Sequence, residues 1–334
     1  MLDKLPGFKL AKKILGPIKW KWKARSIIKD CILHEQQYYV RHCMDTKKSP
    51  KGEDARLVAM YHVIEKGLTM PQRRLGFGQP MVMAILAQIE LVLSLHERRS
   101  TAACDHAKSV LAEYYEIHRN HEGILKPEVE EALKLLLADN QVSVSNQSET
   151  TAKEYWSHLN SNFEDFSASR HSLRSFSSTP VSEEQIRAAV SLANNAPSAC
   201  NRQPCKVYCV EHGKTMDRLL EIQGGNRGFG HLADKLIVLT CNRSCFMTSE
   251  FFSLYVNGGI YLMNLVYSLH FNKVGTCILN WTPGGIHDDE AHKLIDIPEE
   301  ETIIALVACG STPEEFHMAL SPRKSTEETL LFKK

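Results

Sequence analysis

The sequence changes character at a polar stretch, and this change limits the folds that the chain can adopt. Residues 20–139 carry apolar side chains at helical spacing, such as Leu57, Ile64 and Leu68, and show no convincing run with a period of two. After residue 152, short β-branched runs alternate with helical patterns, at 207–210, 236–240, 274–279 and 303–309. The sequence therefore predicts an all-helical N-terminal domain followed by an α+β domain, in which helices flank a mixed sheet.

The stretch DNQVSVSNQSETTA, at 139–152, has no periodicity and is interpreted as a polar linker. It separates a helical domain at 26–138, which proline and glycine breakers divide into four or five helices, from a second domain at 153–334. Residues 1–25 form a separate basic arm.

Two helices of the second domain are well marked in the sequence. Ser182 and Gln185 have the spacing of a capping box and open an amphipathic helix that ends near Asn195. Residues 251–269 are apolar nearly all round. This pattern predicts a helix that is buried on every side or packed against a partner subunit.

Composition excludes several classes of function. The chain has a formal net charge of only +1 and therefore does not have the strong positive field that nucleic-acid binding requires. No nucleic-acid partner is expected. The ten cysteines form no CxxC pair and follow no secretory signal, which predicts reduced thiols and a cytoplasmic location. The most apolar stretch, at 81–95, is shorter than the roughly 20 residues that a membrane span needs.

The basic arm has two interpretations. The first 30 residues contain nine lysines and arginines against two aspartates, with Trp20 and Trp22 among them. Such a segment can lie on an anionic membrane surface, as a peripheral contact, or remain a solvated arm. Glycine and proline breaks, including Gly16 and Pro17, argue against one continuous amphipathic helix.

The motifs of several common enzymes are missing. The sequence has no GxxxxGK[ST], HExxH or GxSxG pattern, and the pair His118 and His121 is interpreted as a helical surface pair, so no metal site is predicted. The glycine run at 224–230 is interpreted as a loop that either borders the active site or does not. The polar stretch at 65–78 is either a lid or substrate loop, or an ordinary interhelical loop.

Residues 169–176, SRHSLRSF, carry the most informative chemistry. Arg170 and Arg174 lie four apart with the Ser172 hydroxyl between them, an arrangement that suits an anion such as a phosphomonoester, although a solvated basic turn is the alternative. About 25 residues later, at 195–204, small and amide residues lie around two prolines. Such a rigid loop can hydrogen-bond a flat heterocycle.

These segments resemble the flavin-dependent nitroreductase family. Its pattern RxSxRxF is matched at 170–176, PVxxExI at 180–186 with one extra acidic residue, and APSxxNxQP at 196–204, and the resemblance extends over about 169–332. The family implies a nitroreductase-like fold for the second domain, an FMN cofactor at a homodimer interface, and NADH or NADPH as the electron donor. No family is recognised for the helical domain.

The resemblance also implies roles for individual residues. Three groups would bind FMN: the phosphate-binding set, the ring-binding set that reaches over from the other subunit, and the strand that brings backbone amides to the ring. They are Arg170, His171, Ser172 and Arg323; Pro197, Ser198, Asn201 and Gln203; and Gly275 and Thr276. Arg174 would lie at the N1 and O2 edge of the flavin and stabilise the negative charge of the reduced ring. Ser321 stands where many relatives have a second cation, and either His171 or Lys324 would have to compensate for it.

The expected activity is an NAD(P)H oxidoreductase that transfers two electrons, in a ping-pong cycle, to a small nitro, quinone, enone or similar acceptor. It needs no side-chain nucleophile. The alternative is a flavin-binding or scaffold protein with little turnover, which recruits partners or a membrane surface through its N-terminal domain.

Overall fold

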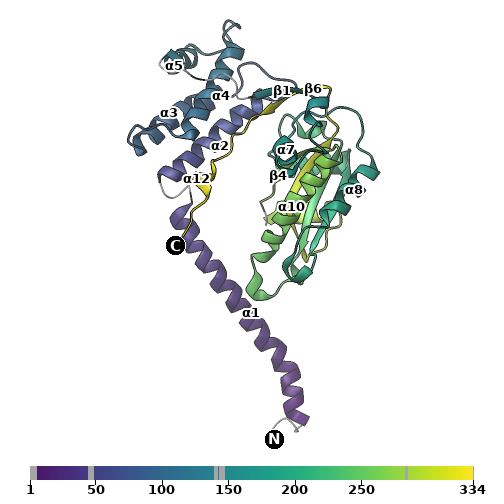
Figure 1. Ribbon diagram of the computed structural model, residues 1–334. Helices are drawn as coiled ribbons and strands as arrows, with labels where there is room; N and C mark the ends of the chain where they lie inside the picture. Colours follow the sequence, from purple (N-terminus) through teal and green to yellow (C-terminus); the bar gives the residue numbers. More distant parts are fainter. Residues whose placement is uncertain (1–5, 44–48, 139–141, 143–146, 283–284, 334) are drawn as a thin grey trace.

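The structure is a computed structural model that describes residues 6–43, 49–138, 142, 147–282 and 285–333 (Figure 1). It consists of a helical region followed by a region in which helices and strands alternate, as the sequence predicts.

Four helices share the core of the helical region. Ser49 begins the first of them, because its hydroxyl accepts a hydrogen bond from the backbone N–H of Gly52 at 3.1 Å. The apolar stripes of the four helices meet in one cluster of buried side chains. The helices are α2 (Pro50–Leu68), α3 (Gln79–Leu95), α4 (Ala102–His118) and α5 (Pro127–Ala138).

Helix α1 (Pro6–His42) corrects one prediction. It is a single helix of 37 residues that continues through Gly16 and Pro17, where the sequence suggested breaks, and the predicted boundary at residue 25 lies inside it. An internal proline removes one backbone donor, and the many hydrogen bonds on either side of it can offset this loss. From residue 20 onward its side chains are mostly exposed, and Trp20 and Trp22 keep 62% and 70% of their surface.

The second region contains a four-stranded sheet with the order β2-β3-β5-β4, in which all neighbours are antiparallel. Among the described residues, the mixed strand directions that the sequence analysis expected are limited to a parallel bridge of Ser172 with Thr276. All four β-branched runs of the sequence are confirmed as strands: β2 (Cys205–Glu211), β3 (Lys235–Asn242), β4 (Gly275–Asn280) and β5 (Glu301–Gly310). A further pair, β1 (Gln147–Thr151) and β6 (Glu315–Ala319), forms a separate two-stranded sheet. The predicted irregular linker therefore ends in a strand.

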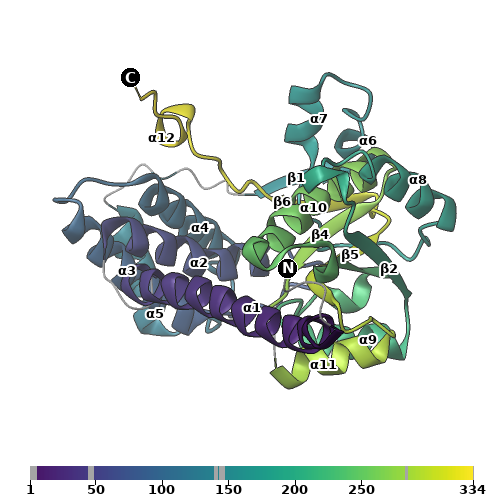
Figure 2. The same ribbon diagram turned by 90° about the horizontal axis from the view of Figure 1, so that it is seen from below.

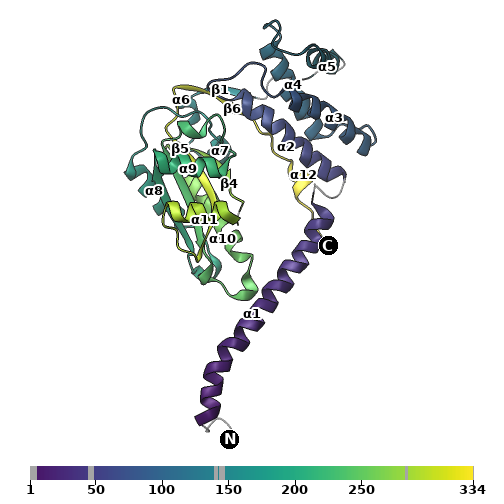
Figure 3. The same ribbon diagram turned by 180° about the vertical axis from the view of Figure 1, so that it is seen from behind.

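Helices cover both faces of the four-stranded sheet. On β3, Ile237 packs with α8 (Glu183–Ala193) and α10 (Ser253–Phe271), whereas Leu236 and Val238 belong to the opposite cluster, with α9 (Lys214–Gln223) and α11 (Gly285–Leu294). Figure 1 shows α10 in front of the sheet, and Figure 3 shows α9 and α11 from behind. The remaining helices are short: α6 (Ala152–Tyr155), α7 (Phe163–Ser169), η2 (Ala199–Asn201), η3 (Gly230–Leu232), η4 (Arg243–Cys245), η5 (Thr248–Glu250) and α12 (Thr326–Thr329).

The predicted capping box is present at the start of α8. The Ser182 hydroxyl accepts a hydrogen bond from the backbone N–H of Gln185 at 3.2 Å, and the Gln185 side chain accepts one from the backbone N–H of Ser182 at 3.0 Å. This reciprocal pair satisfies two donors at the helix terminus.

Helix α10 is buried on one side only. Leu265 and Leu269 are fully covered, while several large apolar side chains on the opposite side remain open to solvent in the single chain. These exposed residues, called the α10 stripe below, are Phe252, Val256, Ile260, Met263 and Phe271.

Among the described residues, no helix combines the length and the apolar character that crossing a bilayer requires. Figure 2 shows the chain after β6 running out to α12, away from the second region.

Candidate functional site

The segment that carries the two arginines lies against strand β4. Ser172 forms a parallel bridge with Thr276, and the backbone N–H of Leu173 donates to the Thr276 carbonyl at 2.8 Å. This approach is close because residue 275 is glycine: a Cβ atom there would meet Leu173 Cδ1 at 2.6 Å. The structure thus brings together Ser172, Gly275 and Thr276, three of the residues that the sequence predicts at one site.

The charges of two arginines act beside this bridge. The pKa of His171 is lowered by burial and by the charges of Arg170 and Arg323. The pKa of His270, on α10, falls to about 4, because of burial first and then the charges of Arg170 and His171. Arg323 is exposed, and its guanidinium donates to the carbonyl of Ser321. The charges of Arg170 and Arg323, which come from the two ends of the second region, therefore act on the same imidazole.

Arg174 is the buried member of this group. Its side chain is 8% exposed, and its Nε atom has no hydrogen-bond partner among the described residues. Its Cζ atom lies 6.0 Å from the ring centroid of Phe229, and its Nη2 atom lies 3.4 Å from Nε2 of His62. A buried guanidinium with an unused donor requires an acceptor, and the edge of a flavin or a phosphate supplies one.

No carboxylate among the described residues forms an ion pair with Arg170, Arg174 or Arg323. Cations without a carboxylate partner hold an anionic ligand more strongly than paired cations would. The residues present therefore fit the phosphate and the electron-rich ring edge of FMN.

The amide-rich loop is held in a strained backbone. Cys200, Asn201 and Gln203 have φ values of 53°, 55° and 48°, which side chains other than glycine rarely adopt. Ser198 Oγ accepts a hydrogen bond from the Gln203 backbone N–H at 3.0 Å, and Gln203 Nε2 donates to Asn201 Oδ1 at 3.2 Å. Pro197, at the edge of the loop, is exposed. Asn201 and Gln203 are exposed as well, so both amides can turn to a ligand.

Two contacts that the sequence did not reveal support this loop. Arg202 forms a bidentate pair with Glu250, at 2.8 Å to each carboxylate oxygen, and hydrogen bonding from Arg202 lowers the pKa of Glu250 to about 2. Asn257 Oδ1 accepts a hydrogen bond from the backbone N–H of Ala199 at 2.8 Å. Neither Glu250 nor Asn257 belongs to a recognisable motif, so only their position in the fold identifies them.

The two halves of the predicted site lie near opposite ends of α10. The Ser169 hydroxyl contacts Nε2 of His270 at 2.9 Å, whereas the loop contacts Asn257. The 13 residues between these contacts span about 20 Å at roughly 1.5 Å per residue. The cavity beside Ser198 has a volume of about 120 Å³, below the roughly 300–1,000 Å³ of typical ligand pockets. The two halves therefore contact α10 far apart along its length.

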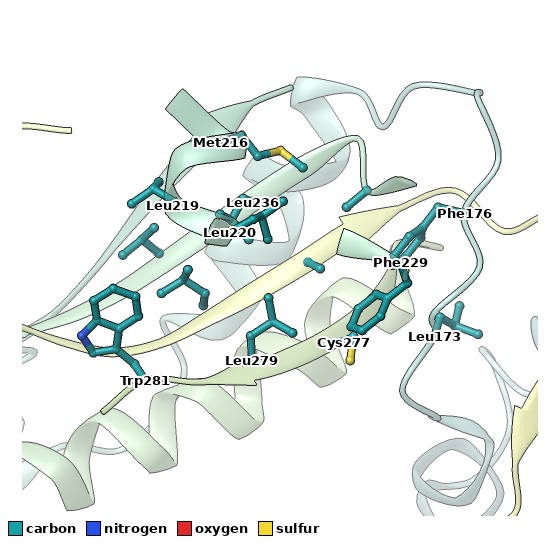
Figure 4. Packing of buried hydrophobic residues seen from close by; sticks show 14 of the residues in the cluster. Leu173, Phe176, Met216, Leu219, Leu220, Phe229, Leu236, Cys277, Leu279 and Trp281 are labelled. Carbon is teal, nitrogen blue, oxygen red and sulfur yellow. The ribbon is translucent and has the colours of Figure 1, made fainter. Parts of the chain in front are cut away.

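The helical domain reaches the buried arginine through α2. His62 contacts Arg174, and the pKa of Lys66 is lowered by burial and then by the charge of Arg174. Met70 Sδ lies 3.2 Å from the point where a Cβ atom would stand at Gly228, the residue before Phe229. Figure 4 shows Phe229 beside Cys277 of β4. The glycine run at 224–230 therefore borders the site, and the stretch at 65–78 lies near it. The sequence analysis did not predict His62. The only signal for it was the polar stretch at 65–78, which begins three residues later.

One further expectation is corrected in the helical domain. His118 is not a surface residue: it is 1% exposed, and its Nδ1 atom lies 2.6 Å from the Tyr114 carbonyl oxygen. The residue was assigned to the surface because helical spacing alone does not show which side of α4 faces the core.

Comparison with known proteins supports the resemblance in the second region. The Nitroreductase family matches residues 168–226, a range that contains the three motif segments at 170–176, 180–186 and 196–204. No curated protein matches the chain.

Solved structures with a similar fold are distant in sequence. A nitroreductase family protein from Streptococcus pneumoniae is 20% identical; the alignment covers 52% of this chain and 100% of that one, with a TM-score of 0.43. An FMN-dependent nitroreductase from Clostridium difficile is 16% identical and covers 51% and 98%, also with a TM-score of 0.43. A protein assigned as a nitroreductase, in complex with FMN, from Desulfovibrio desulfuricans is 21% identical and covers 49% and 92%, with a TM-score of 0.41.

Proposed function

On the premise that residues 168–226 carry the nitroreductase family pattern, we propose that the protein is an FMN-dependent NAD(P)H oxidoreductase. Its acceptor is a small nitro, quinone or enone compound or a similar molecule. The observation that carries this proposal is the unpaired, buried Arg174 next to the Ser172 and Thr276 bridge, within a group of cations.

The residues divide the work of binding. Arg170, His171, Ser172 and Arg323 hold the phosphate by charge and hydrogen bonds. The backbone of Gly275 and Thr276 would hold the ring, and Arg174 would donate to its N1 and O2 edge. When bound, FMN supplies the redox chemistry by accepting a hydride from a nicotinamide and passing two electrons to the acceptor. Arg174 favours that chemistry because a fixed positive group in a site shielded from water stabilises the negative charge that reduction brings.

The site is completed by a second copy of the chain. Within one chain, the loop at 197–203 and the segment that begins at Ser169 contact α10 at Asn257 and His270, which lie about 20 Å apart along the helix. A twofold axis beside the α10 stripe would place this loop of one copy over the arginines of the other, because the two copies in such a dimer present the same surface to each other. The exposed apolar side chains of the stripe suit such an interface.

An absorbance spectrum of the purified protein, recorded before and after anaerobic addition of NADH or NADPH, tests the proposal. A yellow protein that bleaches supports an oxidoreductase. A yellow protein that does not bleach with either nucleotide favours the alternative of a flavin-binding protein with little turnover. A colourless protein that takes up no added FMN contradicts both functions.

The second candidate is recruitment of a membrane surface or a protein through the N-terminal part of the chain. It is favoured by α1, on which Trp20, Trp22 and Tyr39 keep 62%, 70% and 73% of their surface. If the arm binds membranes, the intact protein will sediment with anionic liposomes, and a chain without residues 1–25 will not. Failure of the intact protein to sediment would remove the membrane interpretation.

A further inference from the structure

We propose that Cys205 and Cys241 form a redox-sensitive thiol pair, which a hydroperoxide converts into a disulfide and a dithiol reopens. The pair begins directly after the amide-rich loop at 195–204. Formation of the disulfide does not depend on the proposed function, whereas its effect on FMN binding rests on that function.

The sheet places the two cysteines opposite each other. Cys205 on β2 and Cys241 on β3 are register partners in an antiparallel pair of strands. The backbone N–H of Asn242 donates to the Pro204 carbonyl at 2.8 Å. Residues 204 and 242 therefore form a hydrogen-bonded pair of the ladder, and the cysteines form the neighbouring non-hydrogen-bonded pair, in which opposite side chains lie closest.

This spacing allows a disulfide to form without movement of the strands. The Cα atoms of a non-hydrogen-bonded pair lie about 4.5 Å apart, and disulfides span Cα separations of about 4.4–6.8 Å. Both thiols are free in the structure. Because the expected separation is near the lower limit, the bond would form under strain, and strained disulfides are reduced more easily than relaxed ones. The pair therefore suits a reversible cross-link.

The two thiols differ in chemical character. A hydrogen bond from the Cys241 thiol lowers the pKa of Cys205, although burial opposes this effect. The same hydrogen bond raises the pKa of Cys241, and burial raises it further. Cys205 is therefore the member of the pair that ionises first and acts as the nucleophile, because the thiolate is the reactive form of cysteine.

A small oxidant can reach Cys205 before it reaches Cys241. Cys205 is half-buried and lines the cavity of about 120 Å³ beside Ser198. It also lines a larger cavity of about 720 Å³, to which β2 and α8 contribute. Cys241 is 0% exposed. The first oxidation step therefore belongs to Cys205.

The reaction balances with one molecule of hydrogen peroxide. The Cys205 thiolate attacks one peroxide oxygen, so that an S–O bond forms while the O–O bond breaks, and the hydroxide that leaves takes up a proton to become water. The sulfur of Cys241 then attacks the sulfur of the Cys205 sulfenic acid, and an S–S bond forms while the S–O bond breaks. The proton of Cys241 leaves with the departing oxygen as a second water. The two thiols lose two electrons, which the peroxide gains.

The disulfide would change the support of the amide-rich loop. In its thiol form, Cys205 donates to the backbone carbonyl of Asn257 at 3.8 Å. The side chain of Asn257 accepts a hydrogen bond from Ala199, inside the loop. A disulfide sulfur has no proton to donate, so the contact between Cys205 and Asn257 is lost on oxidation. The redox state of the pair therefore acts on a residue that holds the loop to α10.

The experiment treats the intact chain with hydrogen peroxide, blocks the remaining thiols and maps the tryptic peptides by mass spectrometry. Trypsin separates the two cysteines, because Cys205 falls in the peptide 203–206 and Cys241 in the peptide 236–243. We expect these two peptides to be cross-linked, two of the ten thiols to be lost, and both to return after treatment with dithiothreitol. Cys205→Ser and Cys241→Ala should not give the cross-linked product.

Cys200→Ser and Cys245→Ser are the matched controls. Cys200 lies in the amide-rich loop, and the charge of Cys245 acts on Cys241. Both control variants should keep the cross-linked product. If Cys205 of the wild type links to Cys200 or Cys245 instead, or is oxidised to a sulfinic acid without any link, the inference is wrong. The wild-type map decides this by itself, even where a variant fails to fold.

A titration with FMN measures the effect on the loop. The peroxide-treated wild type should bind FMN about twofold to tenfold more weakly than the reduced protein, as the loss of one hydrogen bond implies, and Cys205→Ser should not respond to peroxide. An unchanged Kd in fully cross-linked protein would exclude the effect on the loop. A protein that binds no FMN in either state contradicts the proposed function, while the peptide map still decides whether the thiol pair forms its disulfide.

Discussion

At the scale of single residues, the site depends on a guanidinium that is buried without a carboxylate. Arg174 leaves Nε without a hydrogen-bond partner among the described residues, and its Nη2 atom contacts the imidazole of His62. Arginine suits this position better than lysine, because its planar fork stays charged when buried and can serve two acceptors at once. The same guanidinium therefore serves the helical domain and the proposed cofactor.

Replacing Arg174 by alanine should slow flavin reduction more than it weakens flavin binding. Removing one fixed electrostatic group from a reacting site typically costs about 10²–10³ in rate, while the phosphate keeps its own ligands. Stopped-flow reduction of the FMN-loaded Arg174→Ala protein by NADH or NADPH measures this effect. Arg187→Ala, an exposed change on α8, is the control, and equal reduction rates for Arg174→Ala and the wild type would remove the role.

Glu65 should stabilise the fold in a pH-dependent way. Its pKa is lowered from 4.5 to about 2 in the folded protein. Its contribution is therefore fully present above the unfolded value of about 4.5 and is lost as pH falls through about 2. Urea unfolding of the wild type and of Glu65→Gln between pH 7 and 2 tests this. The difference in unfolding free energy should be largest near neutral pH and shrink below about pH 4.5, whereas a constant difference would contradict it.

At the scale of elements, strand β4 supports the segment at 170–176, and helices α10 and η5 support the amide-rich loop at 195–204. The bridge between Ser172 and Thr276 exists because Gly275 lets Leu173 approach the strand. The loop keeps its positive φ angles because Glu250, in η5, and Asn257, in α10, hold it from outside. Each half of the site is thus a local structure supported by one neighbouring element.

Gly275→Ala should loosen the segment at 170–176. The added Cβ would meet Leu173 Cδ1 at 2.6 Å and the carbonyl oxygen of Gly310 at 3.0 Å. Overpacking of this kind costs about 1–3 kcal/mol, and FMN binding should weaken with it. Chemical denaturation measures the cost. In a Leu173→Val background, which has no Cδ1, the cost should be smaller. An equal cost in both backgrounds would exclude the contact with Leu173 as its cause.

At the scale of the whole molecule, one chain holds two incomplete half-sites. The arginines and the amide loop are related to different ends of α10, and the α10 stripe between those ends carries exposed apolar side chains. The helical domain adds a third component, because α2 touches Arg174 from the other domain. In the function proposed above, a second copy of the chain completes the site, and the helical domain contributes its contact with Arg174.

Ile260→Asp should give a folded monomer that no longer binds FMN. Ile260 is 41% exposed in the single chain, so a carboxylate is tolerated there but would be buried and unpaired at an interface between two copies. Analytical ultracentrifugation and FMN titration measure the two effects together. Lys214→Glu, an exposed change on α9, is the control. If the Ile260→Asp protein remains a dimer and binds FMN fully, the α10 stripe is not the interface between the two copies.

The sequence by itself determined the elements whose signals are local. The four β-branched runs, the Ser182 capping box and the order of the two regions were all predicted correctly, because periodicity and caps act within a few residues. Strands β1 and β6 escaped prediction because a short polar strand such as QSETT carries no alternation, and its partner lies far along the chain. The continuity of α1 was also missed, since neighbouring turns can offset a break that proline favours.

The tertiary structure alone decided which residues share the site. His62 and Arg174 are 112 residues apart, and their contact depends on where α2 rests against the second region. The segment that begins at Ser169 contacts His270 and the loop at 197–203 contacts Asn257, and only the path of α10 sets these two contacts apart within one chain. Local patterns record what a segment can form, whereas the distance between segments depends on packing of the whole chain, to which residues far apart contribute.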